Sequence, residues 1–340
     1  SAAPEGGARV SPGVATPDPP KRQDLSKYPE SARNLRFPVL SFEIGANTLQ
    51  RRVVISCAVQ LFSRRVIIMN SRTYVLLQNE GHLFHACLTQ GLTALRNARV
   101  DKKGNVYVAF FQLSIGFERL MKVCLIMDHM VKNRLGLPNA ADVRNYGHDL
   151  LKLFDILRGI EVTNGTRPLD TVATNSIEWE LLQYLSEFGM QSRYFNLNEL
   201  SSGKATENPL SHWKHVFERI LREDVPIEDQ NRVVAISTAA AEAIRSFTIV
   251  LANDEAGNPI DVLDAMAQPQ IDDLTAPYAV WHLLALVRPF VDVLVDLRLR
   301  LGGIAHQLSH DSLPVPVMED FIEFSYFNDL ESCLKKTAWH

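Results

Sequence analysis

The stretch that decides the fold reads VYVAFFQLSIGFERLMKVCLIMDHMVKN over residues 106–133 and, after a proline-bearing connection, NYGHDLLKLFDIL over residues 145–157. The first segment is apolar over most of the length of a long helix, and its few charged residues include an acid and a base four residues apart, Glu118 and Lys122. The second segment predicts a shorter helix. Helices this apolar lie inside a bundle, where their few polar side chains need partners. The sequence therefore predicts a helical bundle built around these two segments.

The composition is typical of a soluble globular protein, with 46% hydrophobic and 22% charged residues among 340. The formal net charge of −4 excludes a global basic field of the kind that indicates nucleic-acid binding, but it leaves room for a local basic patch. No apolar run reaches the roughly 18 residues that a membrane-spanning helix needs, so we expect no membrane partner. The four cysteines form no Cys-x-x-Cys pair and predict reduced core thiols in a cytoplasmic protein. They are Cys57, Cys87, Cys124 and Cys333.

The N-terminal part of the chain differs in composition from the rest. Residues 1–35 are rich in Pro, Gly, Ala and Ser and nearly lack large apolar side chains. They predict a flexible tail, because so little surface is available for burial; an arm that orders on a partner or on a second subunit is the alternative. Residues 36–70 contain β-branched runs of strand length that also fit one helical face. They predict either a short β-hairpin or one apolar helix.

Helical periodicity extends over most of the remaining chain, so the predicted fold class is all-α. Ser71 is placed to cap the first of these helices. Pro289 predicts a kink or junction in a long late helix, and Gly302-Gly303 predicts a flexible turn. The polar residues 201–208 predict a loop or soft domain boundary. We expect helices over residues 73–98, 106–134, 142–158, 176–195, 209–223, 230–253, 260–268, 278–301 and 317–336.

The order of motifs along residues 71–200 resembles the HEPN superfamily, the higher-eukaryote and prokaryote nucleotide-binding helical domain. FERLMK lies on one helix, GHDLLKLFD opens the next, and SRYF ends a later one. In the family, a Glu-containing amphipathic helix with a following Lys precedes a His-Asp-Leu helix, and a fourth helix often carries an Arg-Tyr pair. The corresponding residues in this chain are Glu118, Lys122, His148, Asp149, Leu150, Arg193 and Tyr194.

The resemblance implies a HEPN-like bundle over residues 36–200, with an additional C-terminal helical section over residues 209–340. It also implies a bacterial accessory protein that binds nucleotide, RNA or a protein partner such as an antitoxin, in a toxin–antitoxin or phage-defence system, and that forms a homodimer. The ligand-binding residues would be Glu118, Lys122, His148, Asp149, Arg193 and Tyr194.

The same residues have two physical interpretations that do not depend on the family. Glu118 and Lys122 are spaced to form an i,i+4 ion pair, Asp149 is placed to accept backbone N–H groups at a helix start, and Arg193 can bridge to either acid. In one interpretation they form a buried ion-pair and capping network that fixes helix register. In the other, Lys122, His148 and Arg193 line a pocket for a nucleotide or phosphate.

The Arg–His pairs of this chain differ from the nuclease motif of the HEPN family in spacing or position. Many HEPN members are metal-independent ribonucleases that use an Arg-x4–6-His motif across a dimer, where the His transfers a proton and the Arg stabilises the phosphate. No His follows Arg193 at that spacing. Arg144 and His148 are separated by three residues, and Arg300 and His306 by five but outside the resembling region. A dimeric endoribonuclease therefore remains an alternative to a binding protein, and a purely structural adaptor is a third hypothesis.

Other motifs predict no further chemistry. Three histidine pairs have helical spacing, but none has the third ligand and acidic partner that a zinc site needs. They are His82 with His85, His212 with His215, and His306 with His310. No Gly-rich phosphate loop or nucleophile elbow occurs. We expect neither a metal nor a cofactor.

Overall fold

The computed structural model of the chain describes residues 72–99, 102–190, 195–202, 208–253, 259–309, 315–326 and 328–340. The predicted tail, the predicted hairpin or helix of residues 36–70 and the predicted cap at Ser71 lie outside these residues. Within them the regular structure is helical, and the bridge between Asn253 and Pro259 is the one β pairing in the described part of the chain. The all-α prediction is confirmed.

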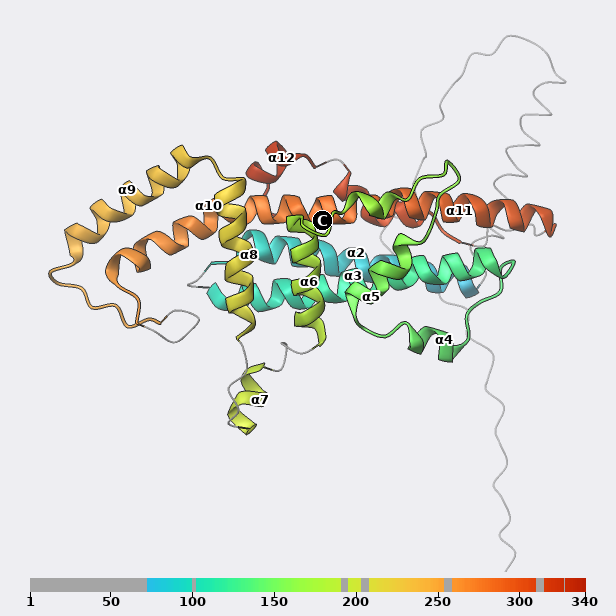
Figure 1. Ribbon diagram of the computed structural model, residues 1–340, viewed down its shortest axis with the longest axis horizontal. Helices are drawn as coiled ribbons and strands as arrows, with labels where there is room; N and C mark the ends of the chain where they lie inside the picture. The colour runs from blue at the N-terminus through green and yellow to red at the C-terminus, as the bar shows by residue number, and fades with distance from the viewer. Residues whose placement is uncertain are drawn as a thin grey trace, which may run out of the picture. The chain divides into compact units, whose positions relative to one another are not determined.

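Two long helices, α2 and α3, run side by side with the successive helices α10 and α11, while α6 and α8 cross them (Figure 1). The α-helices are α2 (Arg72–Arg96), α3 (Lys103–Lys132), α4 (Ala140–Asn145), α5 (Leu150–Arg158), α6 (Ile177–Met190), α7 (Phe195–Ser202), α8 (Pro209–Glu223), α9 (Ile227–Ile244), α10 (Val262–Val287), α11 (Pro289–Gln307) and α12 (Leu330–Lys335). Two 3-10 helices are η4 (Pro168–Thr171) and η6 (Met318–Ser325).

Glycines allow α2 and α3 to approach closely. A Cβ atom at Gly91 would lie 2.7 Å from Cγ of Leu113, and one at Gly116 would lie 2.8 Å from Cγ of Leu88. Ordinary carbon–carbon contacts are about 3.5–4.0 Å. Any side chain at either glycine would therefore push the two helices apart.

The prediction of one helix over residues 142–158 is wrong, because α4 and α5 are separated by a turn. Gly147 has a φ of +70°, which is outside the range of a right-handed helix. The side chain of Asp149 then caps the start of α5. The polar Tyr-Gly-His-Asp sequence thus ends one helix and begins another, and it directs His148 away from the helical path.

Helix α10 begins in the segment expected over residues 260–268 and continues without a break into the first part of the segment expected over residues 278–301. It continues through Pro269 and Pro277, although an interior proline costs about 3 kcal/mol. Most residues after Pro277 are buried in the core, and this burial offsets the cost. The predicted junction at Pro289 is confirmed, since this residue begins α11.

Two predictions near the C-terminus are wrong. Gly302-Gly303 lies inside α11 rather than in a flexible turn, because Leu301 and Ala305 on the same helix are buried and hold it against the core. The helix expected over residues 317–336 is divided into η6 and α12. Ile322 and Phe324 of η6 are buried in the core.

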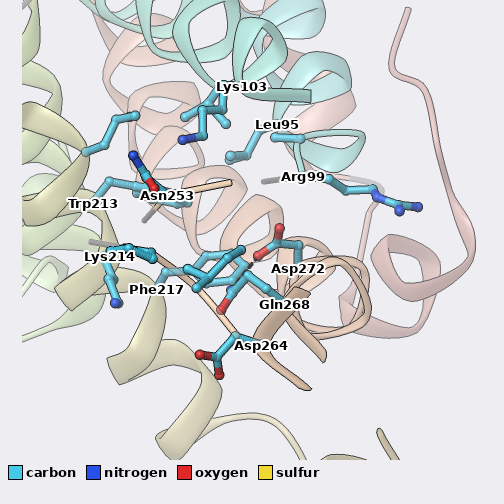
Figure 2. A pocket seen from close by; sticks show the side chains of 15 residues that line it. Leu95, Arg99, Lys103, Trp213, Lys214, Phe217, Asn253, Asp264, Gln268 and Asp272 are labelled. Carbon is cyan, nitrogen blue, oxygen red and sulfur yellow. Dashed lines mark hydrogen bonds between the residues drawn. The ribbon is translucent and has the colours of Figure 1, made fainter. Parts of the chain in front are cut away.

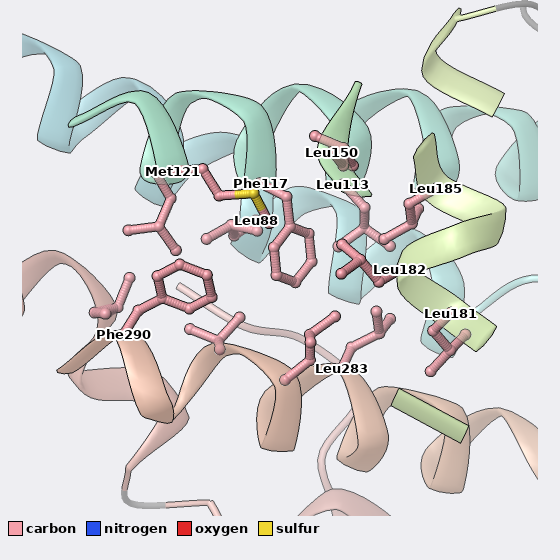
Figure 3. Packing of buried hydrophobic residues seen from close by; sticks show 14 of the residues in the cluster. Leu88, Leu113, Phe117, Met121, Leu150, Leu181, Leu182, Leu185, Leu283 and Phe290 are labelled. Atoms are coloured by element: carbon pink, nitrogen blue, oxygen red, sulfur yellow. The ribbon is translucent and has the colours of Figure 1, made fainter. Parts of the chain in front are cut away.

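One hydrophobic core runs through the described helices, and α3 lies at its centre (Figure 3). Phe117 and Met121 of α3 face Phe290 at the start of α11, and Leu88 of α2 lies behind them. Leu283 of α10 and a row of leucines on α6 complete this layer. Helices from both sides of the predicted boundary at residues 201–208 therefore share the same core.

The segment Val262–Gln307, which comprises α10 and α11, is long and apolar enough to cross a membrane by length and composition. Its most apolar window has a mean hydropathy of 1.5, and 61% of that window is buried within the protein. A helix that is apolar on all sides is also what a protein core requires, so this composition is weak evidence for a membrane.

Candidate functional site

Three of the predicted site residues, Glu118, Lys122 and His148, meet at the surface and are called the His148 cluster below. Nζ of Lys122 lies 2.7 Å from Oε1 of Glu118, and Nδ1 of His148 lies 2.9 Å from the same oxygen. The side chains of Glu118 and Lys122 retain 25% and 19% exposure, whereas that of His148 retains 76%. The predicted i,i+4 pair is therefore present on α3, and the imidazole reaches it from the turn before α5.

The start of α5 fixes the position of His148. Oδ1 of Asp149 accepts hydrogen bonds from the backbone N–H groups of Leu151 and Lys152 at 3.1 and 3.3 Å. Oγ of Ser186 on α6 donates to the same carboxylate at 3.0 Å and accepts the N–H of Leu150 at 2.9 Å. Burial opposes the ionisation of Asp149, but these hydrogen bonds outweigh it and lower the pKa of the carboxyl group. Asp149 is thus a helix cap tied to α6, and its neighbour His148 is held at a defined place.

The cluster presents an oriented imidazole to solvent. Because a carboxylate only accepts hydrogen bonds, Nδ1 of His148 carries the proton that Glu118 accepts. The other ring nitrogen, Nε2, has no partner among the described residues. It can accept a proton when the ring is neutral and donate a hydrogen bond to an anion when the ring is protonated. The ammonium of Lys122 shares the carboxylate that holds the ring.

The remaining predicted residues are engaged elsewhere or lie outside the described chain. Nε of Arg144 donates to the carbonyl of Ala140 at 3.0 Å. Arg300 pairs with Asp296 at 3.4 Å. His306 lies six residues further along the same continuous helix. The two side chains therefore leave the helix in directions about 120° apart, and they do not form a site on one face. Arg193 and Tyr194 lie outside the described residues.

Three of the paired histidines make contacts within the fold. Nδ1 of His85 donates to the carbonyl of Phe321 at 2.8 Å, and the ring of His82 meets the edge of the same phenyl group with centroids 4.9 Å apart. Nδ1 of His212 donates to Oε2 of Glu187 at 2.9 Å. In the described part of the chain no three ligand-type side chains gather to hold a metal ion.

The sequence did not predict a second ionic site, here called the His282 triad and formed by His282, Glu178 and Asp224. Nδ1 of His282 on α10 lies 2.7 Å from Oε1 of Glu178 on α6, and Nε2 lies 3.0 Å from Oδ2 of Asp224 at the end of α8. Both ring nitrogens therefore donate, and the ring is a charged imidazolium that joins three helices. The only sequence signal was one histidine in an otherwise apolar run, YAVWHLL, which requires a buried partner.

Electrostatics favour the charged form of this triad. Burial opposes protonation of His282, but its hydrogen bonds to both carboxylates outweigh that effect and raise its pKa above 6.5. Burial likewise opposes ionisation of Glu178, but hydrogen bonds from His282 and Ser176 lower its pKa from 4.5 to about 2. A ring whose two nitrogens are both occupied is unable to act as a general base. The triad is therefore structural.

Of the two ionic sites, only the His148 cluster offers an open nitrogen to a ligand. Comparisons of this chain with protein-family models, with curated proteins and with solved structures found no match, so the resemblance to the HEPN superfamily stays a prediction carried by the motifs.

Proposed function

We propose that this chain is a HEPN-like accessory protein that binds RNA through a phosphate group at the His148 cluster, in a toxin–antitoxin or phage-defence system. The observation that supports this proposal is the imidazole of His148, which Glu118 orients through Nδ1 and which is open to solvent at Nε2. A protonated imidazole held in one orientation donates a charge-assisted hydrogen bond to a phosphate oxygen at little entropic cost.

The surroundings of the cluster suit an anion. Lys122 places a second positive charge on the same carboxylate. Arg144 and Lys152 flank His148 along the chain, and both are exposed. Because the chain as a whole is acidic, its affinity for RNA would depend on these few local cations. Binding should therefore weaken as the salt concentration rises, with a shallow slope.

Fluorescence anisotropy with a labelled single-stranded RNA tests this proposal, with His148→Ala as the variant. A charge-assisted hydrogen bond contributes about 1.5–3 kcal/mol, so we expect the affinity to fall at least about tenfold. The His148 side chain is 76% exposed, so the variant should fold normally. His306→Ala removes another exposed histidine, from α11, and should leave the affinity unchanged. Equal affinities of the wild type and His148→Ala would refute the proposal.

A metal-independent endoribonuclease is the second candidate, because a carboxylate-oriented imidazole with an open nitrogen is also a general base. Incubation of RNA with the protein in the presence of a chelator distinguishes the two functions. Cleavage that His148→Ala abolishes and His306→Ala preserves would establish the nuclease. Cleavage should also depend on protein concentration if the site is completed across a homodimer, as the resemblance implies. A structural adaptor would show neither binding nor cleavage.

A further inference from the structure

A cavity of about 260 Å³ lies between the C-terminal end of α2, the start of α3, helix α8 and the first half of α10 (Figure 2). It is separate from the His148 cluster. Lys103 at the cavity and Glu118 in the cluster are 15 residues apart on the continuous helix α3, which corresponds to about 22 Å. The volume is slightly below the 300–1,000 Å³ or so of most ligand pockets, so the cavity suits one small molecule.

One wall of the cavity is aromatic and rigid. Trp213 and Phe217 of α8 line it, with ring centroids 5.3 Å apart. Trp213 also packs against Phe110 of α3 and Tyr184 of α6, at centroid distances of 4.7 and 5.8 Å. Because these buried rings hold the indole in place, it offers a fixed surface on which a flat ring can stack.

The polar side chains divide the cavity into a basic and an acidic side. Lys103 and Lys214 line it and form no ion pair with another described residue, and the ammonium of Lys103 points toward Trp213 and Asn253 (Figure 2). Arg99 is turned away and pairs with Asp273 at 3.3 Å. Across from Lys103, α10 contributes Gln268 and Asp272.

The acidic side of the cavity offers an oriented hydrogen-bond acceptor. Nε2 of Gln268 donates to Oδ1 of Asp272 at 2.9 Å, and Asp272 is 8% exposed. This bond orients the amide of Gln268, whose oxygen can accept a further hydrogen bond. A ligand amine at this end would therefore meet an amide oxygen that is already oriented.

We propose that this cavity binds a small flat aromatic molecule that carries an amine at one end and an anionic group at the other. The ring would stack on Trp213 and contact Phe217, the anionic group would meet Lys103 and Lys214, and the amine would face the acidic side of the cavity. The anionic group is either a carboxylate or a phosphate. This site and its ligand are independent of the RNA-binding function proposed above.

Isothermal titration calorimetry with 4-aminobenzoate and with adenosine 5′-monophosphate tests both forms of the anion. We expect at least one of them to bind to the wild type, and binding of only one would identify the anionic group. The double variant Lys103→Ala/Lys214→Ala should weaken that binding at least about tenfold, because it removes both charge-assisted contacts to the anionic group. Lys335→Ala, at an exposed lysine on α12, is the matched control and should bind as the wild type does. Failure of both compounds to bind at millimolar concentration, or an unchanged affinity in the double variant, would overturn the proposal.

The orientation of the ligand has its own test. Gln268→Leu removes the amide at nearly constant volume and breaks its bond to Asp272. It should weaken 4-aminobenzoate several-fold and leave benzoate, which lacks the amine, almost unchanged. Equal losses for the two compounds would overturn the assignment of the amine to the acidic side, even if the lysine variants behave as expected.

Discussion

Replacement of His282 by leucine should destabilise the protein by about 3 kcal/mol. The change removes two charge-assisted hydrogen bonds, at 2.7 and 3.0 Å, each of which contributes about 1.5–3 kcal/mol. Breaking a buried ion pair on one side costs about 3–5 kcal/mol. The side chains of Glu178 and Asp224 keep 19% and 23% exposure, so water solvates part of the negative charge that the variant leaves unpaired. The loss of stability should therefore lie at the lower end of this range. With about 2 cal/mol/K of unfolding entropy per residue over 340 residues, a loss of about 3 kcal/mol corresponds to a fall in Tm of about 4 °C.

The cost of His282→Leu should depend on pH with a defined sign. Because folding raises the pKa of His282 above 6.5, its contribution is complete below about pH 6.5 and is lost as the pH rises through the folded value. Folding lowers the pKa of Glu178 from 4.5 to about 2, so that contribution is complete above about pH 4.5 and is lost in stronger acid. The difference in stability between wild type and variant should be largest between these limits and should shrink in alkaline solution.

Urea unfolding followed by circular dichroism, at about pH 5.5 and about pH 9, measures this difference. His212→Ala is the matched control, because His212 also pairs with a glutamate at 2.9 Å but both side chains are substantially exposed. An exposed pair contributes less than about 1 kcal/mol. If His282→Leu costs no more than His212→Ala, or costs the same at both pH values, the triad does not stabilise the fold as an imidazolium.

Two further predictions concern helix packing and capping. Gly116→Ala should destabilise the protein by about 1–3 kcal/mol, because its Cβ would lie 2.8 Å from Cγ of Leu88. Gly104→Ala should be neutral or slightly stabilising, because no described atom outside the helix's own backbone lies within 4 Å of the new Cβ. Thermal unfolding of the two variants compares them, and equal effects would contradict the packing argument. Asp149→Ala should cost about 0.5–2 kcal/mol as a lost helix cap, measured by urea unfolding, while Asp149→Asn should retain most of the stability because the amide oxygen still accepts the backbone N–H groups.

The sequence predicted the parts of the fold that depend on local pattern. The apolar run that contains Glu118 and Lys122 is the buried helix α3, and the pair forms at the predicted spacing. Asp149 caps α5, as a short acidic side chain at a helix start predicts. These outcomes follow from residues within one or two helical turns of each other.

Predictions failed where distant packing decides the outcome. The local preferences of Pro277 and of Gly302-Gly303 oppose a helix, but the buried faces of α10 and α11 override them. The partners of His282 lie 104 and 58 residues away along the chain, so no local pattern identifies them. The residues that line the cavity near Lys103 come from segments far apart in the sequence, so no local pattern predicts this cavity either.

The position of α3 at the centre of the core has a consequence for synthesis on the ribosome. Its apolar surface is complete when Lys132 has been made, yet one of its core partners, Phe290, follows about 160 residues later. At about 5–20 residues per second, this delay lasts roughly 8–30 s. Helices α2, α5 and α6 can pack on the other faces of α3 earlier, but the face that packs on α11 stays exposed during that time. The core is therefore completed only after α11 has been made.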